Sequence, residues 1–113
     1  MVLTIQPKDA AQLIQSGNVE VIDVRERHEW VTGHIPGARH VPLSRFRQSP
    51  KSHLQGDSFI FVCAAGARSQ LAAQLATACG CEQAYNLTGG TRAWVAAGLE
   101  LVVPSEQPAQ AAI

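Results

Sequence analysis

The residues around Cys63 are of the kinds that make a reactive thiol. Cys63 ends a run of strand-forming residues, and the residues that follow it are small: Ala64, Ala65, Gly66 and Ala67. Such a loop can curl tightly, because Gly66 can take a positive φ, and its backbone N–H groups then point inward. A helix that begins just after the loop adds the positive end of its dipole. A thiol at that point is favoured as the thiolate, so we predict that Cys63 is a nucleophile.

Arg68 and Ser69 come at the start of the helix that the sequence predicts after this loop. The Arg68 guanidinium, five positions after Cys63, can bind an oxyanion through two parallel hydrogen bonds. We therefore predict that the loop, with Arg68 and Ser69, binds a small anionic substrate. An inert buried thiol is the common alternative for a free cysteine in a strand, and the small-residue loop argues against it.

Alternating strand and helix patterns must position this loop. Two short apolar runs, 19–23 (VEVID) and 58–63 (SFIFVC), indicate buried parallel strands, and shorter strands are expected at 84–87 and near Ile5. Helical patterns lie between and after the strands, at 7–15, 25–32, 43–47, 69–79 and 91–97. The alternation predicts the α/β class, with a central parallel sheet flanked by helices on both faces. Cys63 then lies at the carboxyl end of a strand, where open parallel sheets bind ligands.

The composition argues against several classes of function. Nine basic and nine acidic residues balance without forming runs, so we expect neither a nucleic-acid partner nor a membrane partner. The N-terminus lacks the pattern of a secretory signal, and no apolar run is long enough to cross a bilayer. Three cysteines in such a chain indicate reduced thiols and a cytoplasmic location rather than a disulfide framework.

The other two cysteines are expected to be structural rather than reactive. Cys79 shares a predicted apolar helix stripe with Leu71 and Leu75, so we expect it to pack in the core. Cys81 is expected to begin the next strand. The histidines have no metal-ligand spacing with the cysteines, so we expect no metal site, and nothing in the sequence calls for a cofactor.

The segment CAAGARSQLAAQLATACG, which begins at Cys63, resembles the active-site loop and helix of rhodanese domains. Three other stretches resemble motifs of that family in the same order: IDVRE at 22–26, GHIPGA at 33–38, and LTGG at 87–90 with Ala93-Trp94 and Gly98 after it. We therefore assign residues 1–103 to a single rhodanese-like domain. Residues 104–113 are rich in Pro, Gln and Ala without a pattern, and we expect a disordered tail.

This resemblance implies a sulfurtransferase. The Cys63 thiolate would take the outer sulfur of an anionic donor, such as thiosulfate or a persulfide. The resulting Cys63 persulfide would pass that sulfur to cyanide or a thiol, and another protein could supply or accept it. The amides of residues 64–68 would hold the terminal sulfur, and Arg68 would attract the anionic end of the donor.

Further motif residues are interpreted as structural: Asp23, Arg25, Glu29, His34, Gly89 and Gly90. The first three are expected to form hydrogen bonds and ion pairs that tie a strand end to a helix. The histidine accompanies a Pro-Gly turn, and a thiolate held by amides needs no general base. The glycine pair permits a tight helix entry and can border the pocket. Two positions depart from the family pattern, His40 and Leu99, and both lie outside the Cys63 loop.

Two other classes of function stay open. A cysteine-dependent phosphatase or arsenate reductase also uses a loop that runs from Cys to Arg, usually with about five residues between them and an acid to protonate the leaving group. Here the four residues 64–67 intervene, and none is acidic. A non-catalytic interaction module of the rhodanese family tends to lose the cysteine, which this chain keeps. Sulfur transfer is therefore the favoured prediction.

Overall fold

The structure is a computed structural model that describes residues 1–106 of the 113-residue chain. Its centre is a five-stranded sheet in the order β1-β5-β4-β2-β3, and every pair of neighbouring strands is parallel. The strands are β1 (Leu3–Ile5), β2 (Glu20–Asp23), β3 (Arg39–His40), β4 (Ser58–Val62) and β5 (Gln83–Leu87). The predicted parallel sheet is confirmed, with β4 as its central strand.

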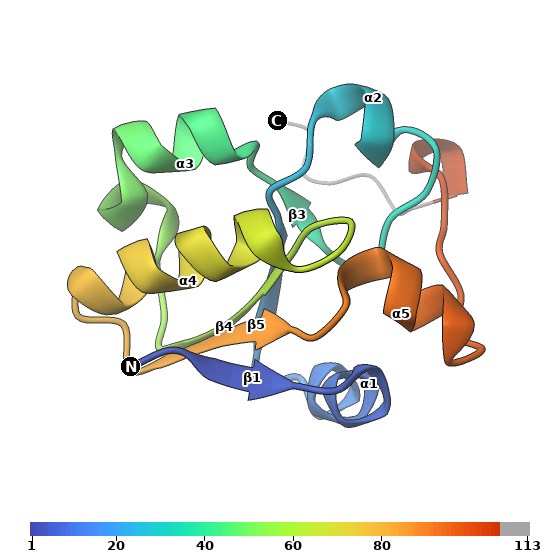
Figure 1. Cartoon of the computed structure of the whole chain (residues 1–113), viewed down its shortest axis with the longest axis horizontal. Helices are drawn as coiled ribbons and strands as arrows, with labels where there is room; N and C mark the ends of the chain where they lie inside the picture. Colours follow the sequence, from blue (N-terminus) through green and yellow to red (C-terminus); the bar gives the residue numbers. More distant parts are fainter. Residues whose placement is uncertain (107–113) are drawn as a thin grey trace.

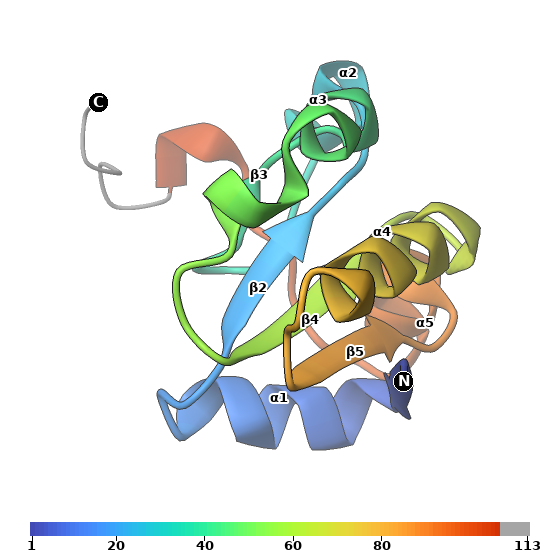
Figure 2. The same ribbon diagram turned by 90° about the vertical axis from the view of Figure 1, so that its left-hand side faces the viewer.

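Helices cover both faces of the sheet, as predicted. They are α1 (Pro7–Gln15), α2 (Arg27–Trp30), α3 (Leu43–Gln48), α4 (Ala67–Ala78) and α5 (Gly90–Ala96), with a 3₁₀ turn η1 (Pro50–His53) after α3. Figures 1 and 2 show α3 and α4 together on one face and α1 and α5 together on the other, which agrees with the contacts within each pair. The fold is therefore a three-layered α/β domain.

The central strand buries different side chains on its two faces. Phe59 and Phe61 lie in one apolar core with residues of α3 and α4. Ile60 and Val62 lie in the other core with residues of α1 and α5. A strand that is buried on both faces is apolar along its whole length, which is why this segment could be predicted from the sequence. Each such buried side chain contributes about 1.5–3 kcal/mol to the free energy of unfolding. The end of β4, where the Cys63 loop begins, is therefore held in place by packing on both faces.

The sequence did not predict β3. This strand has two residues, Arg39 and His40, and it pairs with β2 at the edge of the sheet. A segment this short cannot display the alternation by which strands are identified. The predicted helix at 25–32 is also longer than α2 at both ends. At the first end, Glu26 and Glu29 form a capping box that begins the helix at Arg27.

The prediction that Cys79 packs in the core is wrong, because this side chain is exposed. The fully buried face of α4 consists of Ser69, Ala72, Ala73 and Ala76. After α4 the chain turns at Gly80, whose φ is +95°, and Cys81 N–H donates to Ala76 O at 3.0 Å. This turn delays the next strand, so Cys81 precedes β5 rather than beginning it.

The predicted tail begins at residue 104, where the structure has the 3₁₀ turn η2 (Pro104–Glu106). The rest of that predicted tail, 107–113, lies outside the described residues. Within residues 1–106, no helix combines the length and the apolar character that crossing a membrane requires.

Candidate active site

Cys63 directly follows β4, and its side chain lies beneath the loop that leads into α4. The residue is 1% exposed. Its Sγ accepts a hydrogen bond from Gly66 N–H at 3.0 Å and lies 3.3 Å from Ser69 Oγ. The loop therefore encloses the sulfur and directs polar groups at it, as the sequence predicted.

Gly66 makes this geometry possible. It is the N-cap of α4, with a φ of +114°, in the left-handed region that other residues resist. This conformation turns the chain back toward Cys63, so that the Gly66 N–H group faces the sulfur instead of solvent. The 12-residue helix α4 begins at the next residue, and the positive end of its dipole lies beside the sulfur.

Two opposing effects set the pKa of the Cys63 thiol. Burial raises it, because a charged sulfur is poorly solvated in the protein interior. The Ser69 hydroxyl and the backbone N–H groups of Ser69, Gly66 and Ala65 lower it, because they favour the thiolate. The polar groups win, and the pKa of Cys63 falls below its ordinary 9.0. The thiolate is thereby favoured at a site from which most water is excluded.

Asn86 on β5 completes this arrangement, and sequence reasoning missed it. Its Oδ1 accepts a hydrogen bond from Ser69 Oγ at 2.6 Å, and its Nδ2 donates to Gly66 O at 3.1 Å. Asn86 therefore fixes both the hydroxyl and the peptide that surround the sulfur. The signal in the sequence was an amide side chain within a predicted inner strand, since a buried amide needs partners.

The Ser69 hydroxyl has a single proton and two acceptors within reach, Cys63 Sγ and Asn86 Oδ1. A hydroxyl hydrogen rotates to the stronger acceptor. When Cys63 is a thiolate, the charged sulfur is the stronger acceptor, and the proton serves it. Ser69 can therefore follow the charge on Cys63 without any movement of heavy atoms.

The glycine pair at the start of α5 packs directly against the Cys63 loop. Gly90 packs so closely that a Cβ there would overlap Cys63 O and lie 2.5 Å from the Ala64 carbonyl carbon. The next two N–H groups, of Thr91 and Arg92, donate to Cys63 O and Ala64 O at 2.9 and 3.1 Å. The pair was predicted to permit a tight helix entry, and the structure places that entry directly against the Cys63 loop.

Arg68 lies in the first turn of α4, but its guanidinium is already paired. Its Nη1 and Nη2 donate to Glu29 Oε1 and Oε2 at 2.8 and 2.9 Å. This two-pronged bond lowers the pKa of the Glu29 carboxyl to about 2 and raises the pKa of Arg68. The sequence predicted a guanidinium that receives an oxyanion in this manner, and in the structure the oxyanion is a side chain of α2.

The remaining motif residues hold the framework together. The buried Arg25 donates from Nε and Nη2 to the Asp23 carboxylate at 2.8–3.0 Å, and from Nη2 to Gly33 O at 2.7 Å. His34 is fully buried, and its ring stacks on Trp30 with 3.5 Å between the ring centres. Its backbone pairs with Val102 through two hydrogen bonds of 2.8 Å. Through the Asp23 and Arg25 contacts, the end of β2 is joined to the backbone at Gly33.

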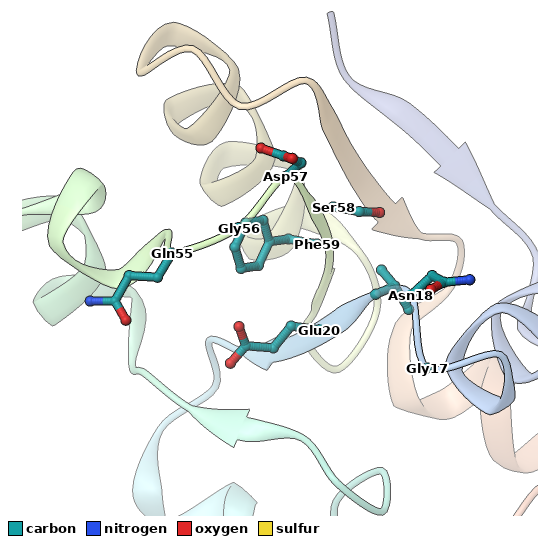
Figure 3. A pocket seen from close by; sticks show the side chains of 9 residues that line it. Gly17, Asn18, Glu20, Gln55, Gly56, Asp57, Ser58 and Phe59 are labelled. Atoms are coloured by element: carbon teal, nitrogen blue, oxygen red, sulfur yellow. The ribbon is translucent and has the colours of Figure 1, made fainter.

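A hollow of about 280 Å³ lies at the amino ends of the strands, away from Cys63, and Figure 3 shows the side chains that line it. It is lined by the amino ends of β2 and β4, including Glu20, Asp57 and Ser58. Residues 1–106 contain no group of three or more His, Cys, Asp or Glu side chains that could hold a metal ion. Among the described residues, the lowered thiol pKa and its surrounding amides make the Cys63 loop the candidate active site.

Comparison with known proteins identifies the class. The model of the Rhodanese-like domain family matches residues 6–97, and the chain belongs to that family. A protein of unknown function from Rhodopseudomonas palustris, described as a possible tyrosine phosphatase, has a solved structure with a TM-score of 0.79 and 31% sequence identity. That alignment covers 89% of this chain and 85% of that one.

Two relatives in sequence are informative. The thiosulfate:glutathione sulfurtransferase of Homo sapiens is 30% identical over 106 residues, which cover 81% of this chain and 92% of that protein. An uncharacterized protein from Synechocystis sp. is 38% identical over 106 residues, which cover 94% of this chain. The match covers 59% of the Synechocystis protein, so the chain spans about three fifths of that relative's length.

Proposed function

We propose that this domain is a sulfurtransferase that carries sulfane sulfur as a persulfide on Cys63. The observation that supports it most directly is the buried Cys63 sulfur, which accepts a bond from the Gly66 N–H group and has a lowered pKa. A persulfide keeps its negative charge on the terminal sulfur. Backbone N–H groups around Cys63 suit that charge as well as they suit the thiolate.

The reaction has two steps. In the first, the Cys63 thiolate attacks the outer sulfur of thiosulfate; a new S–S bond forms, the S–S bond of thiosulfate breaks, and sulfite leaves with the electron pair. In the second, cyanide or a thiolate attacks the terminal sulfur of the persulfide, and Cys63 leaves as a thiolate. No proton has to be moved in either step when cyanide is the acceptor, which suits a site without a general base.

The donor and the acceptor are narrower proposals. The human relative is named for transfer between thiosulfate and glutathione, and we propose for this chain a small anionic sulfur donor with a thiol acceptor, either of which could be borne by another protein. We expect no nucleic-acid or membrane partner, since the charges balance at nine basic and nine acidic residues. A reducing compartment such as the cytoplasm suits three free cysteines.

A phosphatase is the second candidate, because the solved Rhodopseudomonas structure is described in those terms. The Cys63 loop argues against it, since four residues separate Cys63 from Arg68 and none of them can protonate a leaving group. Arg68 is also bound to Glu29 rather than open to a phosphate.

A parallel assay separates these functions. Purified protein is given thiosulfate and cyanide, and thiocyanate is measured; the same protein is given an aryl phosphate, and phosphate release is measured. We expect thiocyanate formation that depends on Cys63, and no phosphate release above the level of Cys63→Ser. Phosphate release without thiocyanate would replace the proposal with the phosphatase, and inactivity in both assays with an unreactive Cys63 would favour a non-catalytic module.

A further inference from the structure

Two of the arginines near the Cys63 loop are already paired with a carboxylate. Arg25 binds Asp23, and Arg68 binds Glu29. The charges of Cys63 and Asp23 both raise the pKa of Arg68, which places all of these groups within electrostatic reach of one another. The two ion pairs therefore add no net positive charge beside the sulfur.

The Glu29 carboxylate of this pair is held in place by a second contact. Glu29 Oε1 also accepts the Glu26 N–H at 2.9 Å within the capping box of α2, so the carboxylate is held by its own helix. Arg68 extends to it from the first turn of α4. The carboxylate stays ionised across ordinary pH, since Arg68 holds its pKa at about 2. An anion that needs the guanidinium must compete with a preorganised partner of the same charge.

We propose that Glu29 is a specificity-determining residue, which by occupying both terminal nitrogens of Arg68 disfavours dianionic donors relative to organic persulfides. This inference rests on the proposed sulfur transfer. Thiosulfate carries charge on its sulfonate oxygens, which would seek the guanidinium and would meet the Glu29 carboxylate as well. A singly charged alkyl persulfide carries its charge on the sulfane sulfur, which the loop amides receive, so it has no need of Arg68.

The test is Glu29→Gln, which removes the charge but keeps an oxygen that can accept the Glu26 N–H. Glu20→Gln is the matched control, because it breaks the Arg39–Glu20 ion pair of 2.7 Å, changes the net charge equally, and lies at the amino end of β2 beside the hollow in Figure 3. Donors are thiosulfate and the persulfide of 2-mercaptoethanol. The measured quantities are the KM and kcat for sulfur loading of Cys63.

For Glu29→Gln we expect the KM for thiosulfate to fall about two- to fivefold, the range for one partly exposed charge interaction. The KM for the alkyl persulfide and both kcat values stay unchanged. Arg68→Ala leaves the carboxylate uncompensated and raises the KM for thiosulfate. Glu20→Gln changes none of these constants. A purely structural role of Glu29 would instead change both donors alike and lower the thermal unfolding temperature.

A binding measurement keeps this inference separate from the proposed function. Thiosulfate is titrated into Cys63→Ser protein with and without Glu29→Gln, where no sulfur transfer occurs, and tighter binding is expected in the double variant. An unchanged or weaker affinity, or an unchanged KM for thiosulfate in an active Glu29→Gln protein, overturns the role of Glu29. If the unaltered protein loads no sulfur from either donor, the proposed function fails, and this titration alone decides the role of Glu29.

Discussion

Cys63 is buried and Cys81 is partly buried, and their surroundings change their acidity in opposite directions. Cys63 lies at the carboxyl end of β4, where the Gly66 N–H group donates to its sulfur at 3.0 Å, and its pKa is lowered. Cys81 lies before the amino end of β5, where burial and nearby carboxylates raise its pKa. Burial and nearby carboxylates therefore disfavour a thiolate, and a sufficient set of polar groups directed at the sulfur favours it.

Replacing Cys63 or Cys81 with serine is expected to give the largest difference in sulfur-transfer activity. Cys63→Ser is expected to lower sulfur transfer by a factor of about a thousand or more, since the step that forms the persulfide is lost. Cys81→Ser is expected to retain activity, because this side chain lies at the other end of the sheet. Steady-state thiocyanate formation measures both, and a large loss in Cys81→Ser would contradict the division between the two ends.

The close approach of Gly90 to the loop gives the next largest effect. In Gly90→Ala the new Cβ would overlap the Cys63 and Ala64 peptide at a φ of +61°, so the loop must shift. We expect a loss of about 2–5 kcal/mol in the free energy of unfolding from backbone strain and overpacking together, with a parallel loss of sulfur transfer.

Gly98→Ala is the matched control for Gly90→Ala. Gly98 has a φ of +85° but no atom within 4 Å of its added Cβ, so only backbone strain applies, at about 1–2 kcal/mol. Urea unfolding and activity measure both variants. Equal losses of activity in the two would mean that contact between α5 and the loop has no part in positioning Cys63.

The Ser69 hydroxyl gives a smaller and more specific effect. Ser69→Ala removes a group that favours the thiolate, so the pKa of Cys63 is expected to rise. Alkylation by iodoacetamide increases with pH as the thiolate forms, and its midpoint for Cys63 should move to higher pH. Cys81 in the same sample is the internal control, and its profile should not move. A Cys63 midpoint that stays in place or falls would mean that the Ser69 hydroxyl does not lower this pKa.

The thiolate loop could be predicted from local sequence. The small residues after Cys63, the αL conformation of Gly66 and the helix that follows are all consequences of neighbouring residues, and they could be predicted together. The partner of Arg68 could not, because Glu29 is 39 residues away and meets it only when α2 and α4 are placed by the fold. Asn86 reaches the loop in the same way, from β5.

The fold was predicted where the apolar pattern was unambiguous. The continuous apolar run of β4 indicated a strand buried on both faces. Helix α4 was harder to orient, because apolar residues occur around most of its circumference, and the pattern did not distinguish the stripe with Leu71 and Leu75 from the buried Ala72, Ala73 and Ala76. In the structure the small alanine side chains pack against the sheet, and Cys79 is exposed.

The most direct test of the central claim is the intact mass of the protein after brief exposure to thiosulfate. We predict a gain of about 32 Da, one sulfur atom held as a persulfide, which is absent from Cys63→Ser, present in Cys81→Ser and removed by excess cyanide. A gain that persists in Cys63→Ser would assign the sulfur to another thiol. No gain in a folded protein whose Cys63 still alkylates readily would contradict sulfur transfer from thiosulfate at this loop.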